Sequence, residues 1–295
     1  MWMPPTYQVL KDGRAHFNHG PIDLVISIQG RDHDVAEATD RAWHRFSSIL
    51  NELVEELAAL REPVRVGQMF SSPVARRMQK AVEPFAGTAF VTSMAAVAGA
   101  VADEICDVIS DGNAFDKVHV NNGGDIALHL DGSQTMRVGM VPDQVIEGGV
   151  AKVQGTVDIR PGDGIGGIAT SGRHGRSFSL GIADAVTVLA TDAAAADVAA
   201  TLIANSVDIE SDKISRTPAV DLDPDSDLGD RPVTVEVATL TNMEIMHALG
   251  NGEARAQNFL RRGFIRAAAL HLGGETRVIS APEDKLIQQE DYAWT

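Results

Sequence analysis

The sequence predicts a mixed α/β fold, with helices packed on mixed sheets and a β-α-β extension at the carboxyl end. Three observations support this fold class. Segments with helical periodicity alternate with short β-branched runs, and glycines separate many of the predicted strands. Apolar residues make up 44% of the 295 positions, which is enough for a sizeable core.

Composition indicates which kinds of partner and which cellular compartment to expect. A formal net charge of −16 repels phosphate backbones, so we do not expect nucleic acid as a partner. The sequence has no uncharged apolar run of about 18 residues, so we expect no membrane span. The single cysteine, Cys106, lies in an alanine- and valine-rich run, which indicates a core thiol in a reducing compartment. We therefore expect a cytoplasmic protein.

The amino-terminal part predicts a hairpin followed by three helices. Residues 7–10 and 22–28 are β-like runs, and residues 34–60 repeat apolar side chains at helical spacing. Pro73 opens a shorter helix that Pro84 ends. Residues 92–109 carry so many small side chains that we expect a buried central helix against which another backbone lies closely.

The middle of the chain predicts strands at residues 118–120, 126–130, 156–159, 168–170 and 185–189. An alanine-rich helix over residues 191–205 follows them. With the elements before it, this gives a core over residues 1–210.

The carboxyl-terminal part begins with residues 211–232, rich in proline and aspartate, which we interpret as an acidic exposed connection. Residues 233–295 then form an extension packed on the core. It contains a strand at 233–239, helical segments at 244–249 and 253–262, and a closing hairpin at 264–270 and 276–279.

The first candidate site segment is the run Asn122, Gly123, Gly124 and Asp125. Two adjacent glycines permit backbone torsions and close approaches that a β-carbon would block, and the neighbouring amides can bind a ligand. The alternative is a type I′ hairpin turn, for which an Asn-Gly pair is the usual signal.

The second segment is a glycine-rich stretch ending in Thr170, Ser171, Gly172, Arg173 and His174. Backbone N–H groups, hydroxyls and cationic side chains in one loop suit a phosphate or pyrophosphate. The segment matches neither the P-loop nor the dinucleotide-binding fingerprint, so an ordinary glycine-rich turn is the alternative.

The third candidate is the pair Asp197 and Thr201, which lie on one face of the predicted helix. A carboxylate and a hydroxyl can supply part of a magnesium shell. The alternative is a solvated Asp197 with Thr201 hydrogen-bonded to its own helix.

In chain order, residues 120–126, residues 168–172, the strand at 185–190 and the Asp197–Thr201 pair resemble the ApbE family. Residues 93–100 further resemble a shorter ApbE-like branch. Members of the family use FAD and magnesium to place FMN on a target threonine. The resemblance implies an ApbE-like fold.

The resemblance also implies roles for the candidate residues. Asp197 and Thr201 fall on the family's magnesium positions. The family's loop at the flavin site matches Thr170, Ser171 and Gly172, and its glycine pair, which shapes the pocket floor, matches Asn122, Gly123, Gly124 and Asp125. Together with Arg173 of the phosphate-type loop, these are the candidate residues for binding FAD or FMN.

One departure from the family concerns catalysis. Full ApbE enzymes carry a His-Ile-Asp-Pro-x-Thr-Gly segment before the following strand, and residues 173–184 contain no such motif. His174 is the candidate replacement base, because imidazole titrates near neutrality.

The leading hypothesis is therefore an ApbE-like enzyme that binds a flavin or another phosphate-bearing nucleotide with magnesium. One alternative is a non-catalytic flavin-binding or assembly protein. Another is an enzyme acting on a small heterocyclic or acidic metabolite, with Arg173, His174 and Arg176 as anion clamps. Each involves a small-molecule or nucleotide ligand, and the sequence leaves homo-oligomerisation open.

Overall fold

The computed structural model describes residues 3–112, 114–140, 146–147, 150–153, 155–281, 287–288 and 292–293. The chain divides into two compact units. Unit 1 comprises Met1–Thr135, Arg160–Ala169 and Ala190–Val198, and unit 2 comprises Met136–Ile159, Thr170–Leu189 and Ala199–Thr295. β10 (Gly167–Ser171), β11 (Ala185–Ala190) and α5 (Ala193–Ala204) contribute residues to both.

Unit 1 contains an antiparallel sheet in which neighbours along the chain are mostly neighbours in the sheet. Its strands are β1 (Thr6–Val9), β2 (Ala15–His19), β3 (Ile22–Gln29), β4 (Lys117–Asn122) and β5 (Asp125–Leu130). The first residues of β10 pair with β5. Buried and half-buried residues alternate along β2, β3 and β4, as expected of strands that face a core on one side.

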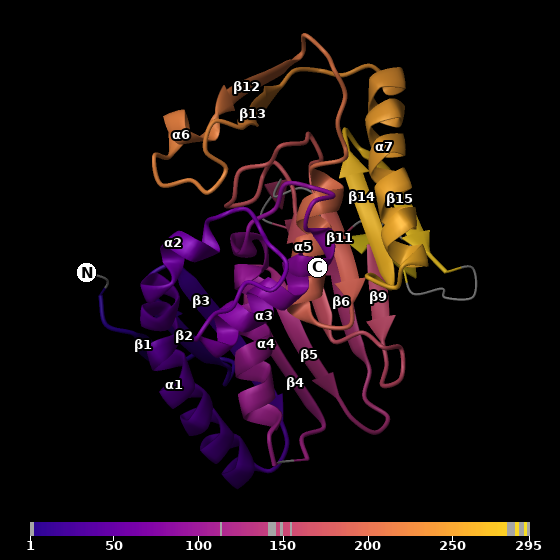
Figure 1. The fold of residues 1–295 in the computed structure, drawn as a ribbon. Coiled ribbons are helices and arrows are strands. Elements are labelled where there is room, and N and C mark those ends of the chain that lie inside the picture. The colour runs from indigo at the N-terminus through magenta and orange to yellow at the C-terminus, as the bar shows by residue number, and fades with distance from the viewer. Residues whose placement is uncertain are drawn as a thin grey trace. The chain divides into compact units, whose positions relative to one another are not determined.

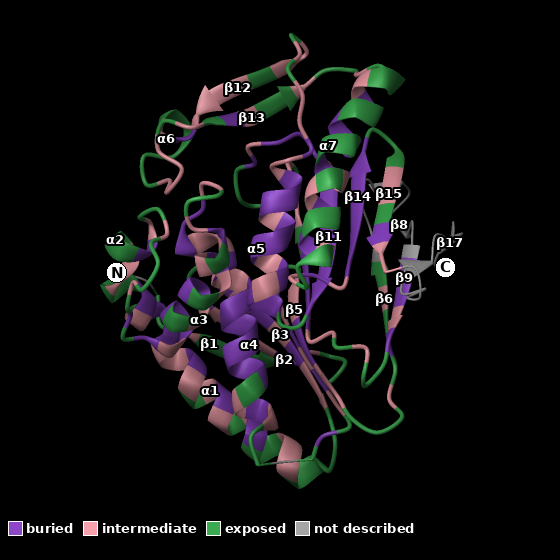
Figure 2. Cartoon of the chain, turned by 45° about the vertical axis from the view of Figure 1, so that its right-hand side comes forward, coloured by how far each residue is buried: buried purple, intermediate pink, exposed green. Residues whose placement is uncertain are grey.

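The helices of unit 1 are α1 (Asp32–Glu55), α2 (Leu57–Leu60), α3 (Pro73–Val82) and α4 (Val97–Ser110) (Figure 1). Ser72 caps α3 ahead of Pro73, and the short 3-10 helix η2 (Ser93–Ala96) precedes α4. α4 packs on β4 and β5 and is buried over most of its length (Figure 2). The predicted buried central helix is confirmed, and Cys106 lies in it as a buried free thiol.

In unit 2, α7 (Asn242–Arg261) packs on a sheet formed by β11, β14 (Ala267–Leu272) and β15 (Glu275–Ser280). β12 (Ile214–Pro218) and β13 (Pro232–Val237) form a separate hairpin with α6 (Ala219–Leu222) between them. β6 (Met136–Met140) pairs with β9 (Gly155–Ile159). The remaining strands are β7 (Ile146–Glu147), β8 (Val150–Val153), β16 (Ile287–Gln288) and β17 (Tyr292–Ala293).

The α/β class and the carboxyl-terminal β-α-β order, β13-α7-β14, are confirmed. Four element predictions need correction. The hairpin predicted from residues 7–10 and 22–28 is wrong, because β2 lies between β1 and β3 and pairs with both. The predicted helix at 34–60 is divided at Glu56, whose carboxylate accepts hydrogen bonds from the N–H groups of Ser71 and Ser72. The two helical segments after residue 243 are one continuous α7, and residues 211–232 contain β12 and α6.

No helix among the described residues is long and apolar enough to cross a membrane.

Candidate functional site

The turn between β4 and β5 consists of Gly123 and Gly124, which follow the paired residues Asn122 and Asp125. Both glycines have positive φ, at 66° and 117°, as a type I′ turn requires of its two central residues. The Gly124 N–H donates to the Asn121 Oδ1 at 2.9 Å. The hairpin-turn alternative therefore describes this geometry, and it places Asp125 directly after the turn.

Asn122 connects this turn to the start of α4. Its side chain is only 4% exposed, and its Nδ2 donates to the Ala98 carbonyl at 3.1 Å. Its Oδ1 accepts from the Asp23 N–H at 3.4 Å. A buried amide that bonds to two other segments fixes the end of β4 relative to the first turn of α4.

Asp197, on α5, faces the same first turn of α4. Its Oδ2 accepts from the Gly99 N–H at 3.1 Å, and its carboxylate also accepts from the Ala98 N–H. Burial, reinforced by the neighbouring Asp125 carboxylate, raises the pKa of Asp197 well above its ordinary value, although the side chain keeps partial solvent access. The two N–H groups oppose that rise.

Thr201 comes one turn after Asp197 in α5, so the predicted helical spacing is confirmed. Oxygen donors of this kind suit a hard divalent cation. Among the described residues, no three His, Cys, Asp or Glu side chains gather in a group that could hold a metal ion.

Gly166 and Gly167, at the start of β10, have a packing role. A β-carbon on Gly167 would lie 2.2 Å from the Ala193 nitrogen, so only glycine lets β10 run this close to the start of α5. These glycines thus let a strand and a helix meet backbone to backbone.

In unit 2, the residues after β10 surround Asp184. The Arg173 Nη2 lies 2.7 Å from the Asp184 Oδ1, and the His174 Nε2 lies 3.4 Å from the same oxygen. The Thr170 and Thr187 hydroxyls are 3.0 Å apart. The sequence predicted Arg173 and His174 as site residues, but it did not predict Asp184, the carboxylate that lies beside both.

Comparison with known proteins shows the family of the chain. The family model described as "AbpE bacteria" matches residues 7–278. The chain belongs to this family. The resemblance to the ApbE-like superfamily is confirmed.

Relatives of the chain include proteins called UPF0280. The UPF0280 protein of Methanopyrus kandleri is 31% identical over 62% of this chain and 69% of its own length. The UPF0280 protein of Methanothrix thermoacetophila is 37% identical over 46% of this chain and 52% of its own length. The chain thus spans about half of the second relative.

Two solved structures resemble the chain at 14% identity. The ApbE protein of Thermotoga maritima matches with a TM-score of 0.47, covering 94% of this chain and 96% of that one. The apo form of the flavinyl transferase ApbE of Pseudomonas stutzeri matches with a TM-score of 0.38, covering 96% and 95%.

Two further candidate residues, Asp103 and Asp184, were not predicted from the sequence. Asp103 lies in the apolar run of α4, and Asp184 lies between two alanines at the start of β11. A carboxylate inside an apolar run is expected to be buried, and a buried charge requires a hydrogen-bond or ion-pair partner. This expectation could have identified Asp103 and Asp184 from the sequence.

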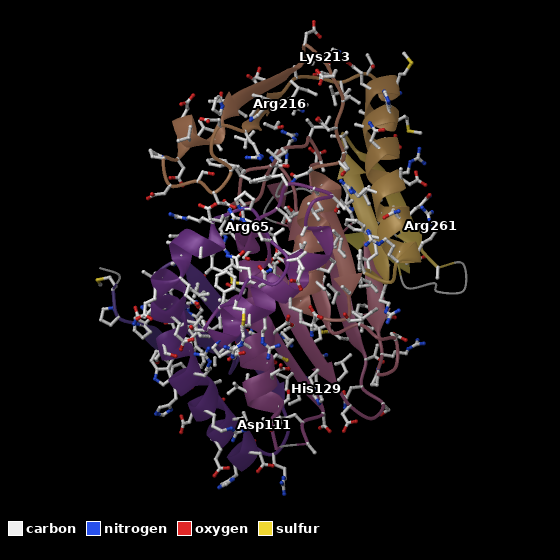
Figure 3. The ribbon with its side chains drawn as sticks, viewed as in Figure 1. Arg65, Asp111, His129, Lys213, Arg216 and Arg261 are labelled. Atoms are coloured by element: carbon white, nitrogen blue, oxygen red, sulfur yellow. The ribbon has the colours of Figure 1, made fainter. Side chains whose placement is uncertain are left out.

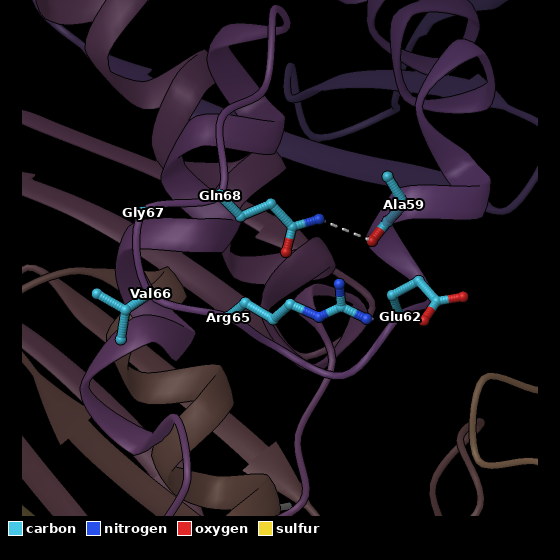
Figure 4. Close-up of a pocket in the computed structure, with 6 residues that line it drawn as sticks. All are labelled: Ala59, Glu62, Arg65, Val66, Gly67 and Gln68. Atoms are coloured by element: carbon cyan, nitrogen blue, oxygen red, sulfur yellow. Dashed lines mark hydrogen bonds and ion pairs between the residues drawn. The ribbon is translucent and has the colours of Figure 1, made fainter.

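A shallow pocket in unit 1 lies apart from the residues described above. It is lined by Ala59, Glu62, Arg65, Val66, Gly67 and Gln68, and the Gln68 side chain donates to the Ala59 carbonyl (Figure 4). None of the predicted site residues lines it.

Two cationic side chains of unit 2, at or next to β12, form ion pairs. Lys213 pairs with Glu244, and Arg216 pairs with Asp208 (Figure 3).

Proposed function

We propose that the chain is a magnesium-dependent enzyme that binds a flavin or another phosphate-bearing nucleotide, related to FAD:protein FMN transferases. The observation that carries this proposal is the carboxylate of Asp197, held at the first turn of α4 with Asp125 nearby. Two carboxylates that repel each other in a partly buried place favour a divalent cation, because the cation neutralises both.

The residues present fit magnesium by their chemistry. Asp197 supplies a charged oxygen and Thr201 a neutral one, which leaves room in the shell for phosphate and water. When bound, magnesium neutralises phosphate charge and thereby assists phosphoryl transfer. The Ala98 and Gly99 N–H groups hold the Asp197 carboxylate and so orient it.

His174 is the proposed base, and Asp184 is its proposed orienting partner. The His174 imidazole is 46% exposed, so it can exchange protons with solvent and a bound acceptor. A carboxylate beside the imidazole can orient the ring of a base. Arg173 shares the same carboxylate.

Calorimetric titration of FAD, with and without MgCl2, tests the proposal on the wild type, Asp197→Asn and Thr201→Val. We expect magnesium to strengthen wild-type binding, Asp197→Asn to remove most of that gain, and Thr201→Val to weaken it less. Asp192→Asn is the matched control, because Asp192 is exposed and directly precedes the same helix. Equal magnesium effects in all four proteins would refute the metal site.

A flavin-binding protein without catalysis is the second candidate. The observation that favours it is the arrangement after β10, where Asp184 pairs with Arg173 and lies beside His174, the proposed base. Incubation with FAD, magnesium and a flavin-acceptor domain separates the two candidates. Covalent FMN on the acceptor, lost in His174→Ala, supports the enzyme, and FAD binding without transfer supports the binding protein.

A further inference from the structure

Helices α4 and α5 cap each other's amino-terminal ends with carboxylates. Asp103, on α4, accepts hydrogen bonds from the N–H groups of Ala193 and Ala194 at the start of α5, both at 2.9 Å. Asp197, on α5, accepts from the Gly99 N–H at 3.1 Å and from the Ala98 N–H at the start of α4. Each helix thus satisfies N–H donors that the other helix cannot satisfy itself.

The two caps flank a backbone contact. A β-carbon on Gly99 would lie 2.2 Å from the Ala193 carbonyl oxygen, so the first turns of the two helices touch directly. Asp103 follows Gly99 by one helical turn, and Asp197 follows Ala193 by one helical turn. The arrangement is therefore reciprocal, with each carboxylate reaching back across the same contact.

Asp103 is the acceptor for the first two N–H groups of α5. The residue is 7% exposed, and its two carboxylate oxygens accept separately from these two N–H groups. The Asp192 side chain accepts from the Ala195 N–H and from the Thr191 hydroxyl, and from neither of the N–H groups that Asp103 holds. Without Asp103, two buried donors would lose their partner, and the first turn of α5 would no longer be fixed against α4.

We infer that Asp103 is a positioning residue for the metal site at Asp197, a role that rests on the proposed function. Asp103 holds the first turn of α5 against Gly99, and Asp197 extends from the next turn toward the same part of α4. A shift of that first turn moves the Asp197 carboxylate away from the Ala98 and Gly99 N–H groups. Asp103 thereby acts on the metal site through the backbone, without contacting the metal.

Mn2+ binding to the full chain, followed by the electron paramagnetic resonance signal of free Mn2+ at pH 8, tests this role without an activity assay. We expect Asp103→Asn to weaken Mn2+ binding about tenfold and Asp103→Ala somewhat more, as supporting residues around metal ligands typically do. Asparagine keeps one acceptor oxygen, so it should retain part of the binding. Asp107→Asn, which removes an exposed carboxylate one turn further along α4, should change binding less than about twofold.

The outcomes separate this inference from the proposed function. Wild-type affinity in a folded Asp103→Ala overturns the positioning role, while loss in Asp197→Asn would still support the metal site. If Asp103→Ala does not fold, Asp103→Asn decides, because it keeps the shape of the side chain. Equal weakening by Asp107→Asn also overturns the inference, since general loss of charge would then explain the effect. Absence of Mn2+ binding in the wild type refutes the proposed metal site and this role with it.

Discussion

Asp184 and Arg173 form a two-point ion pair in unit 2. The Arg173 Nε and Nη2 donate to the Asp184 Oδ1 at 2.9 and 2.7 Å. The other oxygen, Oδ2, accepts from the Gly273 N–H at 2.6 Å, and the Asp184 side chain is 10% exposed. One carboxylate therefore joins the residues after β10 to the turn between β14 and β15.

We expect Asp184→Asn to lower the free energy of unfolding by about 2 kcal/mol, because it leaves the partly buried Arg173 charge without its counterion. Urea unfolding followed by circular dichroism measures the change. Asp12→Asn is the control, since Asp12 pairs with Arg14 in an exposed ion pair and its loss should be undetectable. A loss for Asp184→Asn as small as the control's would mean that the pair contributes no stability.

Gly99→Ala and Gly250→Ala should change stability in opposite directions. A β-carbon at Gly99 meets the Ala193 carbonyl at 2.2 Å, which forces α4 and α5 apart and costs about 3 kcal/mol. Gly250 lies inside α7 with nothing within 4 Å of the added carbon, so alanine there should stabilise by about 0.5 to 1 kcal/mol. Thermal unfolding of both variants tests this, and a stable Gly99→Ala would contradict the backbone contact.

Local patterns predicted the elements well where one periodicity dominates. Phe46, Ile49 and Leu53 recur at helical spacing and are buried in α1. The many small residues of α4 predicted a close backbone approach, and Gly99 makes that approach to Ala193. In each case the signal lies within one element, so sequence spacing alone carries it.

Contacts between distant segments could not be predicted in this way. Asp103 and Ala193 are separated by 90 residues, and Asp184 and Gly273 by 89. Local glycine rules predicted a break in α7, which is nevertheless continuous. Gly252 is instead explained by packing, because a β-carbon there would lie 2.3 Å from the Val207 side chain. For the candidate site, Asp197 was proposed from spacing and resemblance, whereas its bond to Gly99 depends on the fold.

Thr241→Ala should destabilise α7 through its capping box. The Thr241 side chain accepts from the Glu244 N–H, and the Glu244 carboxylate accepts from the Thr241 N–H. We expect a loss of about 1 kcal/mol in urea unfolding. Thr39→Ala is the control, because Thr39 bonds only to the Val35 carbonyl within α1 and should have little effect.

Glu244 should also contribute a pH dependence at low pH. Hydrogen bonds from Lys213 and then from Thr241 lower the pKa of Glu244 to about 2, below its ordinary value of 4.5. The native state then binds fewer protons than the unfolded state between these values, so this contribution is present above about pH 4.5 and lost toward pH 2. Glu244→Gln should reduce the acid destabilisation, and unfolding curves from pH 2 to 5 that superimpose would rule this out.

Asp103 should produce the opposite pH dependence. Burial raises the pKa of Asp103 to about 7 from 3.8, although the Ala193 and Ala194 N–H groups oppose the rise. Between these values the native state holds a proton that the unfolded state has lost, so stability should fall as pH rises from about 4 to 7, by at most about 1.4 kcal/mol per pH unit. Asp103→Asn cannot titrate and should reduce the slope of the unfolding free energy across this range, to which Asp197 also contributes, whereas Asp107→Asn, on the exposed side of α4, should keep the wild-type slope. Urea unfolding at half-unit pH steps measures both slopes, and a wild-type slope retained in Asp103→Asn would assign the effect to another group.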